Sequence, residues 1–392
     1  MALSLGAPFL AGVRGQQPAQ QRPRRVTTPE SGATQKPTAT NSSTDEIDEG
    51  DVVRVDTQLV SVPAIVTNGA GRPLAGLRTE NFLLFENGAQ QKITDFATTE
   101  TPFEIALLLD TSGSTRADVA LIREAANAFV EALRPGDRVA IVGFNTVRQG
   151  RSAVAAPEVL SKLTGDRKEL RLAIERLGSS NGTPFYDGLL RVADEVFLDA
   201  PADDMRGRRA LVALTDGVDS ASESDFETAR QKLIRRGIAS YFIQVNTEDF
   251  VEERLLKDCG DDGAVVLSRK QLERYRRVFF PRAKREDYVD FCAMGSFERM
   301  QVSRDLYNLA RREMNELAKA SGGNNFLAAT LQDARAAFAK VATEIGTQYS
   351  LGYYPENKTR DGKFRTIRVE VQGVPEKAQV RAREGYYAPK GQ

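Results

Sequence analysis

Residues 107–116 of the chain read LLLDTSGSTR. Three leucines lead into Asp110, and Ser112, Ser114 and two threonines follow within a few residues. An apolar run that ends in oxygen-bearing side chains is typical of a buried strand whose carboxyl end opens into a polar turn. Such a turn serves as a helix cap, a nucleophile, a phosphate cradle or a metal site. The rest of the sequence has to separate these uses.

The amino-acid composition excludes several of these functions. Histidine is absent from the 392 residues, which excludes Ser-His-Asp and Cys-His nucleophilic sites and His-ligated zinc. The 54 basic residues balance the 54 acidic ones, so no net charge draws the chain to nucleic acid or membrane. The only two cysteines, Cys259 and Cys292, either form one disulfide in an oxidising compartment or remain free thiols.

The N-terminal segment differs from the rest of the chain. Residues 1–50 are rich in Gln, Pro, Ser and Thr, and we predict that they form a disordered leader. Their first 15 residues are either the remnant of a secretory signal or simply an irregular start. No other stretch approaches about 18 apolar residues, so we expect no transmembrane span.

Residues 51–101 and 347–388 resemble each other in pattern. Both alternate apolar and polar positions, which indicates half-buried strands, and Asn87-Gly88 marks a hairpin in the first segment. Each segment alone is too small for a stable core, but seven strands from the two together would close one β-sandwich. We therefore predict that residues 102–346 form a second domain inserted into this sandwich.

The inserted segment has short, almost wholly apolar strands, and each is expected to be followed by an amphipathic helix. These strands are FEIALLLD (103–110), RVAIVGFN (138–145), RALVALTD (209–216) and ASYFIQV (239–245). Apolar strands alternating with helices predict an α/β fold with a doubly wound, mostly parallel, Rossmann-like sheet. Ligands bind beyond the carboxyl ends of such strands, which is where Asp110 and Asp216 fall.

A third segment, NGTPF, adds Thr183 at the start of a predicted helix. Asp-Gly turns and threonine caps are common, so each motif alone carries little weight. Together, Asp110, Thr183 and Asp216 bring two carboxylates and several hydroxyls to one sheet edge. Such a set suits a hard divalent cation, Mg²⁺ first, with Mn²⁺ or Ca²⁺ as competitors.

The D-x-S-x-S motif at Asp110, Ser112 and Ser114, followed by Thr183 and the T-D-G at Asp216, resembles the metal-ion-dependent adhesion site of von Willebrand factor type A domains. The flanking segments resemble a bacterial subfamily described as VWFA-related proteins. The resemblance implies that Ser112 and Ser114 ligate the metal directly. It also implies that Asp110, Thr183 and Asp216 contribute directly or through water, and that an acidic residue of a partner completes the coordination.

Residues 269–300 depart from a minimal domain of this kind. Within them, residues 269–285 carry eight basic residues together with Tyr275, Phe279 and Phe280. This stretch is either a contact for nucleic acid or an anionic membrane, or a solvated helix whose aromatic side chains pack on the body of the protein. The neutral total charge favours the second interpretation. We expect no nucleic-acid partner and keep weak contact with an anionic surface through residues 269–285 as an alternative.

These observations predict a metal-dependent binding module, not an enzyme, that captures an Asp or Glu of a protein partner. One alternative is an envelope protein that the metal merely stabilises. Another is a hydrolase that uses Asp110 and Asp216, although the sequence offers no general base and no second metal cluster. The leader and the sandwich favour a periplasmic or secreted location, with the cytoplasm as the alternative.

Overall fold

The computed structural model describes residues 59–97, 101–112, 119–150, 152–199, 208–262, 264–284, 290–374 and 377–391. They belong to one compact unit that spans Asp56–Gln392. The expected leader and signal-like start, residues 1–50, and the predicted metal ligand Ser114 lie outside the described residues. No described helix combines the length and the apolar composition that crossing a bilayer requires.

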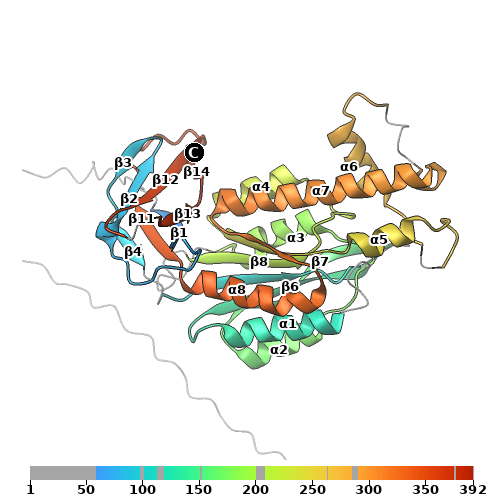
Figure 1. Cartoon of the computed structure of the whole chain (residues 1–392), viewed down its shortest axis with the longest axis horizontal. Coiled ribbons are helices and arrows are strands. Elements are labelled where there is room, and N and C mark those ends of the chain that lie inside the picture. Colours follow the sequence, from blue (N-terminus) through green and yellow to red (C-terminus); the bar gives the residue numbers. More distant parts are fainter. Residues whose placement is uncertain are drawn as a thin grey trace, which may run out of the picture. The chain divides into compact units, whose positions relative to one another are not determined.

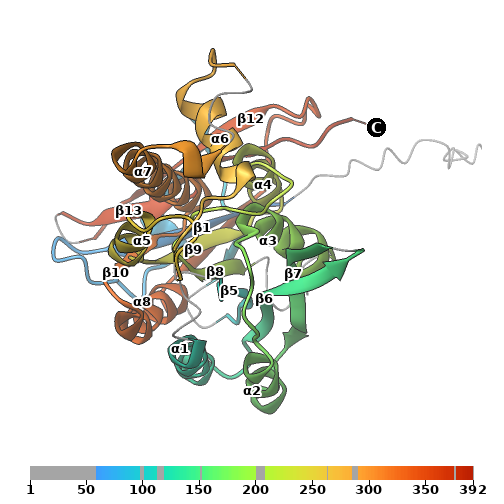
Figure 2. The same cartoon turned by 90° about the vertical axis from the view of Figure 1, so that its right-hand side faces the viewer.

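A six-stranded sheet forms the middle of the fold, in the order β10-β9-β8-β5-β6-β7 (Figure 2). Its strands are β5 (Glu104–Leu109), β6 (Arg138–Gln149), β7 (Ser152–Thr164), β8 (Arg209–Thr215), β9 (Ala239–Val245) and β10 (Asn325–Ala328). All neighbours pair in parallel except β6 and β7. Every residue of β5, β8 and β9 is buried, because helices cover both faces of the sheet.

The helices form a layer on each side of this sheet (Figure 1). One layer contains α1 (Val119–Ala132), α2 (Arg167–Glu175) and α8 (Ala334–Gly346); the other contains α3 (Phe185–Arg191), α4 (Phe226–Arg235) and α7 (Ser296–Ser321). In the first layer the rings of Phe129 and Phe338 meet, with centroids 5.1 Å apart. In the second, Leu233 and Met314 pack in the core. The predicted doubly wound α/β fold is confirmed.

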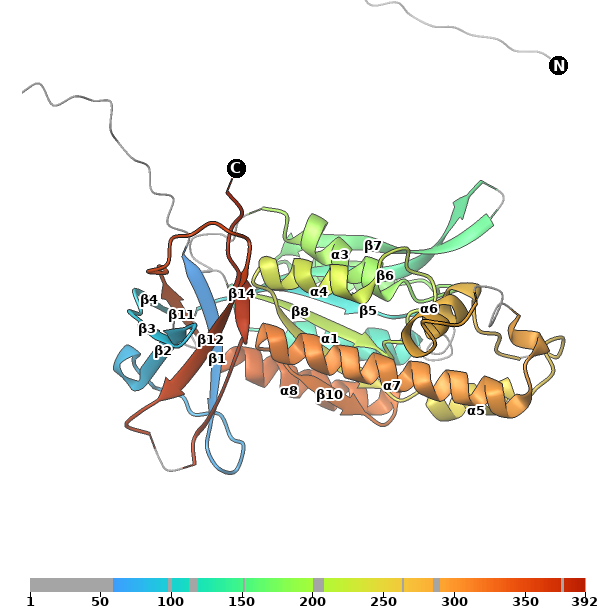
Figure 3. The ribbon, with the colours of Figure 1, turned by 90° about the horizontal axis from the view of Figure 1, so that it is seen from above.

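One connection differs from the prediction. We expected a helix after the strand at residues 138–145, but β6 turns back into the antiparallel strand β7 instead. Figure 3 shows this β6–β7 ribbon projecting from the sheet. β7 is an edge strand, a position that tolerates Pro157, and its many small residues lack the continuous apolar run of the inner strands. The edge position explains why the sequence pattern did not reveal it.

Two four-stranded antiparallel sheets are built from the N- and C-terminal strands, in the orders β13-β1-β11-β4 and β14-β12-β2-β3. Their strands are β1 (Val60–Thr67), β2 (Phe82–Glu86), β3 (Ala89–Gln91), β4 (Asp95–Ala97), β11 (Tyr349–Tyr353), β12 (Phe364–Val371), β13 (Gln379–Ala382) and β14 (Gly385–Tyr387). The sheets share one apolar core that includes Val62, Phe82 and Tyr349. Asn87 and Gly88 both have positive φ, 47° and 86°, as the predicted Asn-Gly hairpin requires.

The strand count also needs a correction, because the described residues contain eight such strands where we predicted seven. The stretch expected to form one strand, AQVRAREGYYA, is divided in two. β13 pairs with β1, while β14 pairs with β12 in the other sheet. The chain therefore changes sheets at Arg383 and Glu384. Arg383 is buried and donates hydrogen bonds to the carbonyl oxygens of Gly385, Ser61 and Ile234, which hold this crossing in place.

The sandwich encloses a polar network around Glu86. Its carboxylate accepts hydrogen bonds from Tyr353 at 2.6 Å and Tyr386 at 2.9 Å, and it forms an ion pair with Arg365 at 3.3 Å. The side chains of Glu86 and Arg365 are only 3% and 4% exposed. Each charge is thus paired and hydrogen-bonded, as buried charges must be.

The long helix α7 joins the two parts of the fold. Its C-terminal end is capped by Gly322 in the left-handed conformation, with φ of 83°. Beside this end, the Glu384 amide donates to the carbonyl oxygen of Ala320 at 3.1 Å, and Lys319 forms an ion pair with Glu384 at 3.1 Å. α7 is therefore attached to the segment that connects the two sheets of the sandwich.

Candidate functional site

The register of the central sheet places the two predicted carboxylates side by side. Leu109 of β5 pairs with Leu214 of β8, so Asp110 and Asp216 follow neighbouring strands at the same edge. The Asp110 amide donates to the carbonyl oxygen of Leu214 at 3.0 Å, and the Thr215 hydroxyl donates to Asp110 Oδ2 at 2.7 Å. The parallel pairing of two buried strands thus builds this half of the site.

The turn after β5 is held by Asp110 itself. The Ser112 amide donates to Asp110 Oδ1 at 3.0 Å, and both residues are buried, at 1% and 2% exposure. Ser114, which we predicted to be a metal ligand, lies outside the described residues. The described part of this turn therefore contributes one carboxylate and one hydroxyl.

Asp216 is also fixed by two donors. The Val218 amide donates to Asp216 Oδ1 at 3.0 Å, and the Thr247 hydroxyl donates to Oδ2 at 2.8 Å. Thr247 is in turn within 2.7 Å of the phenol oxygen of Tyr307 on α7. Asp216 is followed by Gly217 with φ of 77°, a conformation that favours glycine. The carboxylate is thus oriented by its own turn, by Thr247 in the loop after β9 and, through Thr247, by α7.

Thr183 lies opposite, in the loop before α3. Its amide donates to Ser220 Oγ at 2.8 Å and its carbonyl oxygen accepts from the Ser220 amide at 3.0 Å, which ties this loop to the turn after β8. The cap of α3 is supplied by Asp219, whose Oδ2 accepts from the amides of Phe185 and Tyr186 at 2.9 and 3.3 Å. The Thr183 hydroxyl is therefore not needed as a helix cap.

Burial makes these carboxylates electrostatically unusual. Burial, together with the charge of Asp216, raises the pKa of Asp110 to about 7, although hydrogen bonds from Thr215 and Ser112 oppose the shift. Burial likewise raises the pKa of Asp219 to about 6. The carboxylates of Asp110 and Asp216 repel each other in a site with little water. A bound cation would offset this repulsion.

The donor set fits a hard cation. Every predicted ligand atom is a carboxylate or hydroxyl oxygen, the kind of ligand that Mg²⁺, Mn²⁺ and Ca²⁺ prefer. The described residues contain no group of three or more His, Cys, Asp and Glu that would hold a metal ion. A site with two carboxylates completed by hydroxyls would not form such a group, because the Ser and Thr ligands are not among those residue types.

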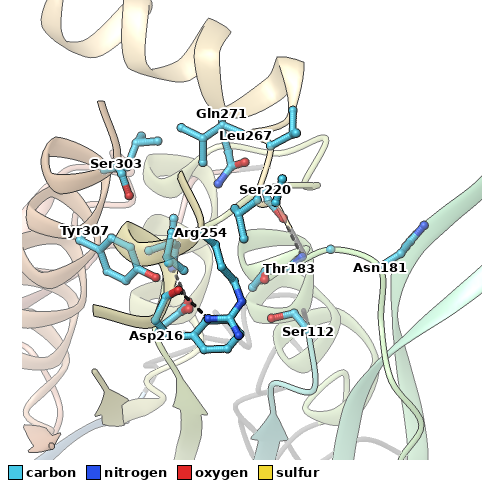
Figure 4. A pocket seen from close by; sticks show the side chains of 18 residues that line it. Ser112, Asn181, Thr183, Asp216, Ser220, Arg254, Leu267, Gln271, Ser303 and Tyr307 are labelled. Carbon is cyan, nitrogen blue, oxygen red and sulfur yellow. Dashed lines mark hydrogen bonds between the residues drawn. The ribbon is translucent and has the colours of Figure 1, made fainter. Parts of the chain in front are cut away.

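Ser112, Thr183 and Asp216 open into a pocket of about 410 Å³ (Figure 4). Its other walls are largely apolar and come from the turn after β8, α5 (Glu248–Leu255), the segment before α6 (Arg269–Phe279) and α7. These walls include Val218, Phe250, Val251, Val265, Leu267 and Leu306. The Ser303 hydroxyl on α7 is buried and has no hydrogen-bond partner among the described residues. Arg254 of α5 also lines the pocket.

Several of these contributors were not predicted. Thr247 lies two residues after β9, close to the strand end as Asp216 is to the end of β8, so its place near a strand end identifies it in retrospect. Arg254, Ser303 and Tyr307 lie on helices whose place beside the pocket depends on tertiary packing, and no local pattern marks them. Of the five predicted site residues, the structure brings Asp110, Ser112, Thr183 and Asp216 together, and the fifth, Ser114, lies outside the described residues.

Residues 269–300, which depart from a minimal domain of this kind, follow in sequence the pocket-lining segment before α6 and extend into α7. Cys259 and Cys292, left open by the sequence, form a disulfide that links the end of α5 to the region before α7. Tyr275 is buried and Phe279 is partly buried against the same core, as the favoured interpretation predicts, whereas Phe280 is 43% exposed. Arg274 is also buried, paired with Glu313 at 2.6 Å, and is thus unavailable to an anionic surface.

A sequence profile of the von Willebrand factor type A domain matches residues 104–271. No curated protein sequence matches the chain. Similar solved structures include the conserved hypothetical protein BatB from Bacteroides thetaiotaomicron (15% identity, TM-score 0.38), which aligns over 62% of this chain and 98% of BatB.

Two others are a von Willebrand factor type A protein from Catenulispora acidiphila and proximal thread matrix protein 1 from the mussel byssus. The first has 12% identity and a TM-score of 0.41 over 81% of this chain and 76% of that protein. The second has 12% identity and a TM-score of 0.39 over 73% and 50%. The profile match includes β5 to β9 and the four described site residues, and residues 104–271 of this chain are a von Willebrand factor type A domain.

Proposed function

We propose that the chain is a metal-dependent binding module. In this proposal Asp110, Ser112, Ser114, Thr183 and Asp216 hold one Mg²⁺, with Mn²⁺ or Ca²⁺ as substitutes, and the ion captures an Asp or Glu of a protein partner. The observation that carries the proposal is the convergence of oxygen side chains from three separate loops on one pocket. A bound Mg²⁺ supplies a coordination position that accepts a carboxylate oxygen.

The protein's own residues prepare this position. Thr215 and the Ser112 amide fix Asp110, while Thr247 and the Val218 amide fix Asp216. Because these hydrogen bonds set the direction of the carboxylates before a cation arrives, little reorganisation accompanies binding. The apolar walls of the pocket limit water and so strengthen the attraction between the cation and an incoming carboxylate.

A metal titration tests the first half of the proposal. Asp110→Asn and Asp216→Asn preserve the shape of each side chain and remove its charge, so Mn²⁺ binding measured by calorimetry should fall at least tenfold. Asp225→Asn is a matched control, because Asp225 caps α4 outside the pocket. Mg²⁺ should raise the melting temperature of the wild type and of Asp225→Asn only. Wild-type Mn²⁺ affinity in both site variants contradicts the proposal.

The disulfide supports a location outside the cytoplasm. Disulfides persist in oxidising compartments such as the periplasm or the extracellular space, and Cys259 is paired with Cys292. We therefore propose a periplasmic or secreted protein. Mass spectrometry of the protein from its native cells, alkylated before any reduction, should recover the Cys259–Cys292 linked peptide. Full alkylation of both thiols contradicts this location.

A further inference from the structure

Arg254 gives the pocket a second cationic group. This residue lies on α5, and its side chain lines the same pocket as Ser112, Thr183 and Asp216. Figure 4 shows it in this pocket together with Asp216, Thr183 and Ser112. The side chain is 31% exposed, so it is partly enclosed by the pocket and still reachable by a ligand.

The position of the guanidinium is fixed mainly by uncharged neighbours. Its carbon lies 3.5 Å from the centre of the Phe250 ring, and Nη1 donates to the carbonyl oxygen of Phe250 at 3.1 Å. Among the described residues its only ion pair is with Glu253, at 3.9 Å, and that carboxylate is 82% exposed. Such a long, solvated pair contributes little, so Arg254 brings a nearly uncompensated positive charge to the pocket.

We infer that Arg254 is the second anchor for the ligand carboxylate, a role that rests on the proposed function. The charges of Asp110 and Asp216 balance those of a divalent cation, which leaves the charge of Arg254 for an incoming anion. A carboxylate has two oxygens, and in this arrangement one meets the metal while the other accepts from the guanidinium. A planar guanidinium suits this because its donors match carboxylate geometry.

The pocket also indicates the kind of partner. A volume of about 410 Å³ with apolar walls accommodates an acidic side chain together with an apolar neighbour. A second groove of about 1140 Å³ adjoins the pocket along β7 and shares Asn181, Gly182, Ser220, Val266 and Gln271 with it. Chain that flanks the acidic residue can follow this groove. The partner is therefore an extended peptide segment in which an acidic residue is next to an apolar one.

Arg254→Gln tests the inference because it should affect metal affinity and peptide affinity differently. Removing a positive charge near the metal should leave Mn²⁺ affinity equal or higher, whereas loss of a charge-assisted hydrogen bond should weaken peptide binding about ten- to a hundredfold. The probe is a synthetic peptide with one central glutamate between leucines, measured in Mn²⁺ by calorimetry, beside its glutamine counterpart. Arg254→Lys should be intermediate, because it keeps the charge and loses the fork geometry.

Arg171→Gln is the matched control, since Arg171 is exposed and pairs with Glu131 outside the pocket. It should bind metal and peptide like the wild type. A general disturbance of α5 would lower both affinities of Arg254→Gln, and that result overturns the role of Arg254. So does equal peptide affinity in wild type and Arg254→Gln. A wild type that binds Mn²⁺ but not the glutamate peptide overturns the partner class, and one that binds no Mn²⁺ contradicts the proposed function itself.

Discussion

The phenol of Tyr307 donates its hydrogen bond to Thr247, at 2.7 Å. The direction follows from the next contact, because Thr247 has a single proton and donates it to Asp216 at 2.8 Å. Burial and the charge of Asp216 both raise the pKa of Tyr307 well above that of a free tyrosine, so the phenol keeps its proton. A chain of two hydrogen bonds thus leads from α7 to a predicted metal ligand.

This chain predicts that Thr247→Val weakens metal binding although Thr247 is not a proposed ligand. Valine has the shape of threonine but leaves Asp216 Oδ2 without its donor. Loss of a residue that orients a ligand typically lowers metal affinity by about ten- to a hundredfold. Thr247→Ser keeps the hydroxyl and should retain near wild-type affinity for Mn²⁺ in calorimetry. Equal affinity in the Val and Ser variants would show that the hydrogen bond does not position Asp216.

The cap of α3 predicts a pH-dependent contribution to stability. Burial raises the pKa of Asp219 from 3.8 to about 6, so the folded state holds the proton more tightly than the unfolded state. The stabilising contribution of this group is complete below pH 3.8 and is lost as the pH rises through about 6. The free energy of unfolding of wild type relative to Asp219→Asn should therefore fall by about 3 kcal/mol between pH 3.5 and 7. Urea denaturation of both proteins across this range measures the difference, and a flat difference rules out the shift.

The ion pair of Glu86 and Arg365 predicts a large effect inside the sandwich. Both side chains are almost fully buried, so Arg365→Met leaves the Glu86 charge without its cation. Breaking a buried pair from one side costs about 3–5 kcal/mol of unfolding free energy. Removing the exposed pair of Arg171 and Glu131 should cost less than about 1 kcal/mol. Chemical denaturation of the two variants should separate them clearly, and similar losses would contradict the assigned burial.

The disulfide predicts that reduction loosens the wall of the pocket. Cys259 and Cys292 are separated by 33 residues, and a cross-link over such a loop contributes about 2–4 kcal/mol. A Cys259→Ser, Cys292→Ser double variant should lose this amount and show faster amide exchange at residues 264–268. A reducing agent should destabilise the wild type but not the double variant. Identical melting of the oxidised wild type and the double variant would contradict a contribution from the disulfide.

Much of the site was predictable because parallel strands obey simple geometry. Asp110 and Asp216 each follow a buried apolar strand, and equal register makes such positions neighbours. Thr183 was predictable from its place before a helix. Arg254 and Tyr307 were not, because they reach the pocket only after α5 and α7 have packed against the sheet. Their positions depend on contacts between segments that are distant in the sequence.

Some strands were likewise predictable from the sequence and others were not. The apolar inner strands were evident, whereas β7 was missed because an edge strand is not required to be apolar on both faces. The division between β13 and β14 was missed because both halves alternate in the same way. Arg383 and Glu384 separate the two halves, and Arg383 is buried, although the alternating pattern alone predicts that an arginine at this position faces solvent.

The position of β1 between β11 and β13 determines the order in which the chain can fold during synthesis. Val60 pairs with Tyr353, and Ala64 pairs with Ala382. At about 5–20 residues per second, β1 leaves the ribosome roughly 15 to 60 seconds before its partners exist. The six strands of the central sheet all lie between Glu104 and Ala328, so this sheet can form before β11 and β13 have been synthesised. A chain cut after β10 would keep the complete central sheet, but of the pairings in the two sandwich sheets it would keep only that of β2 with β3.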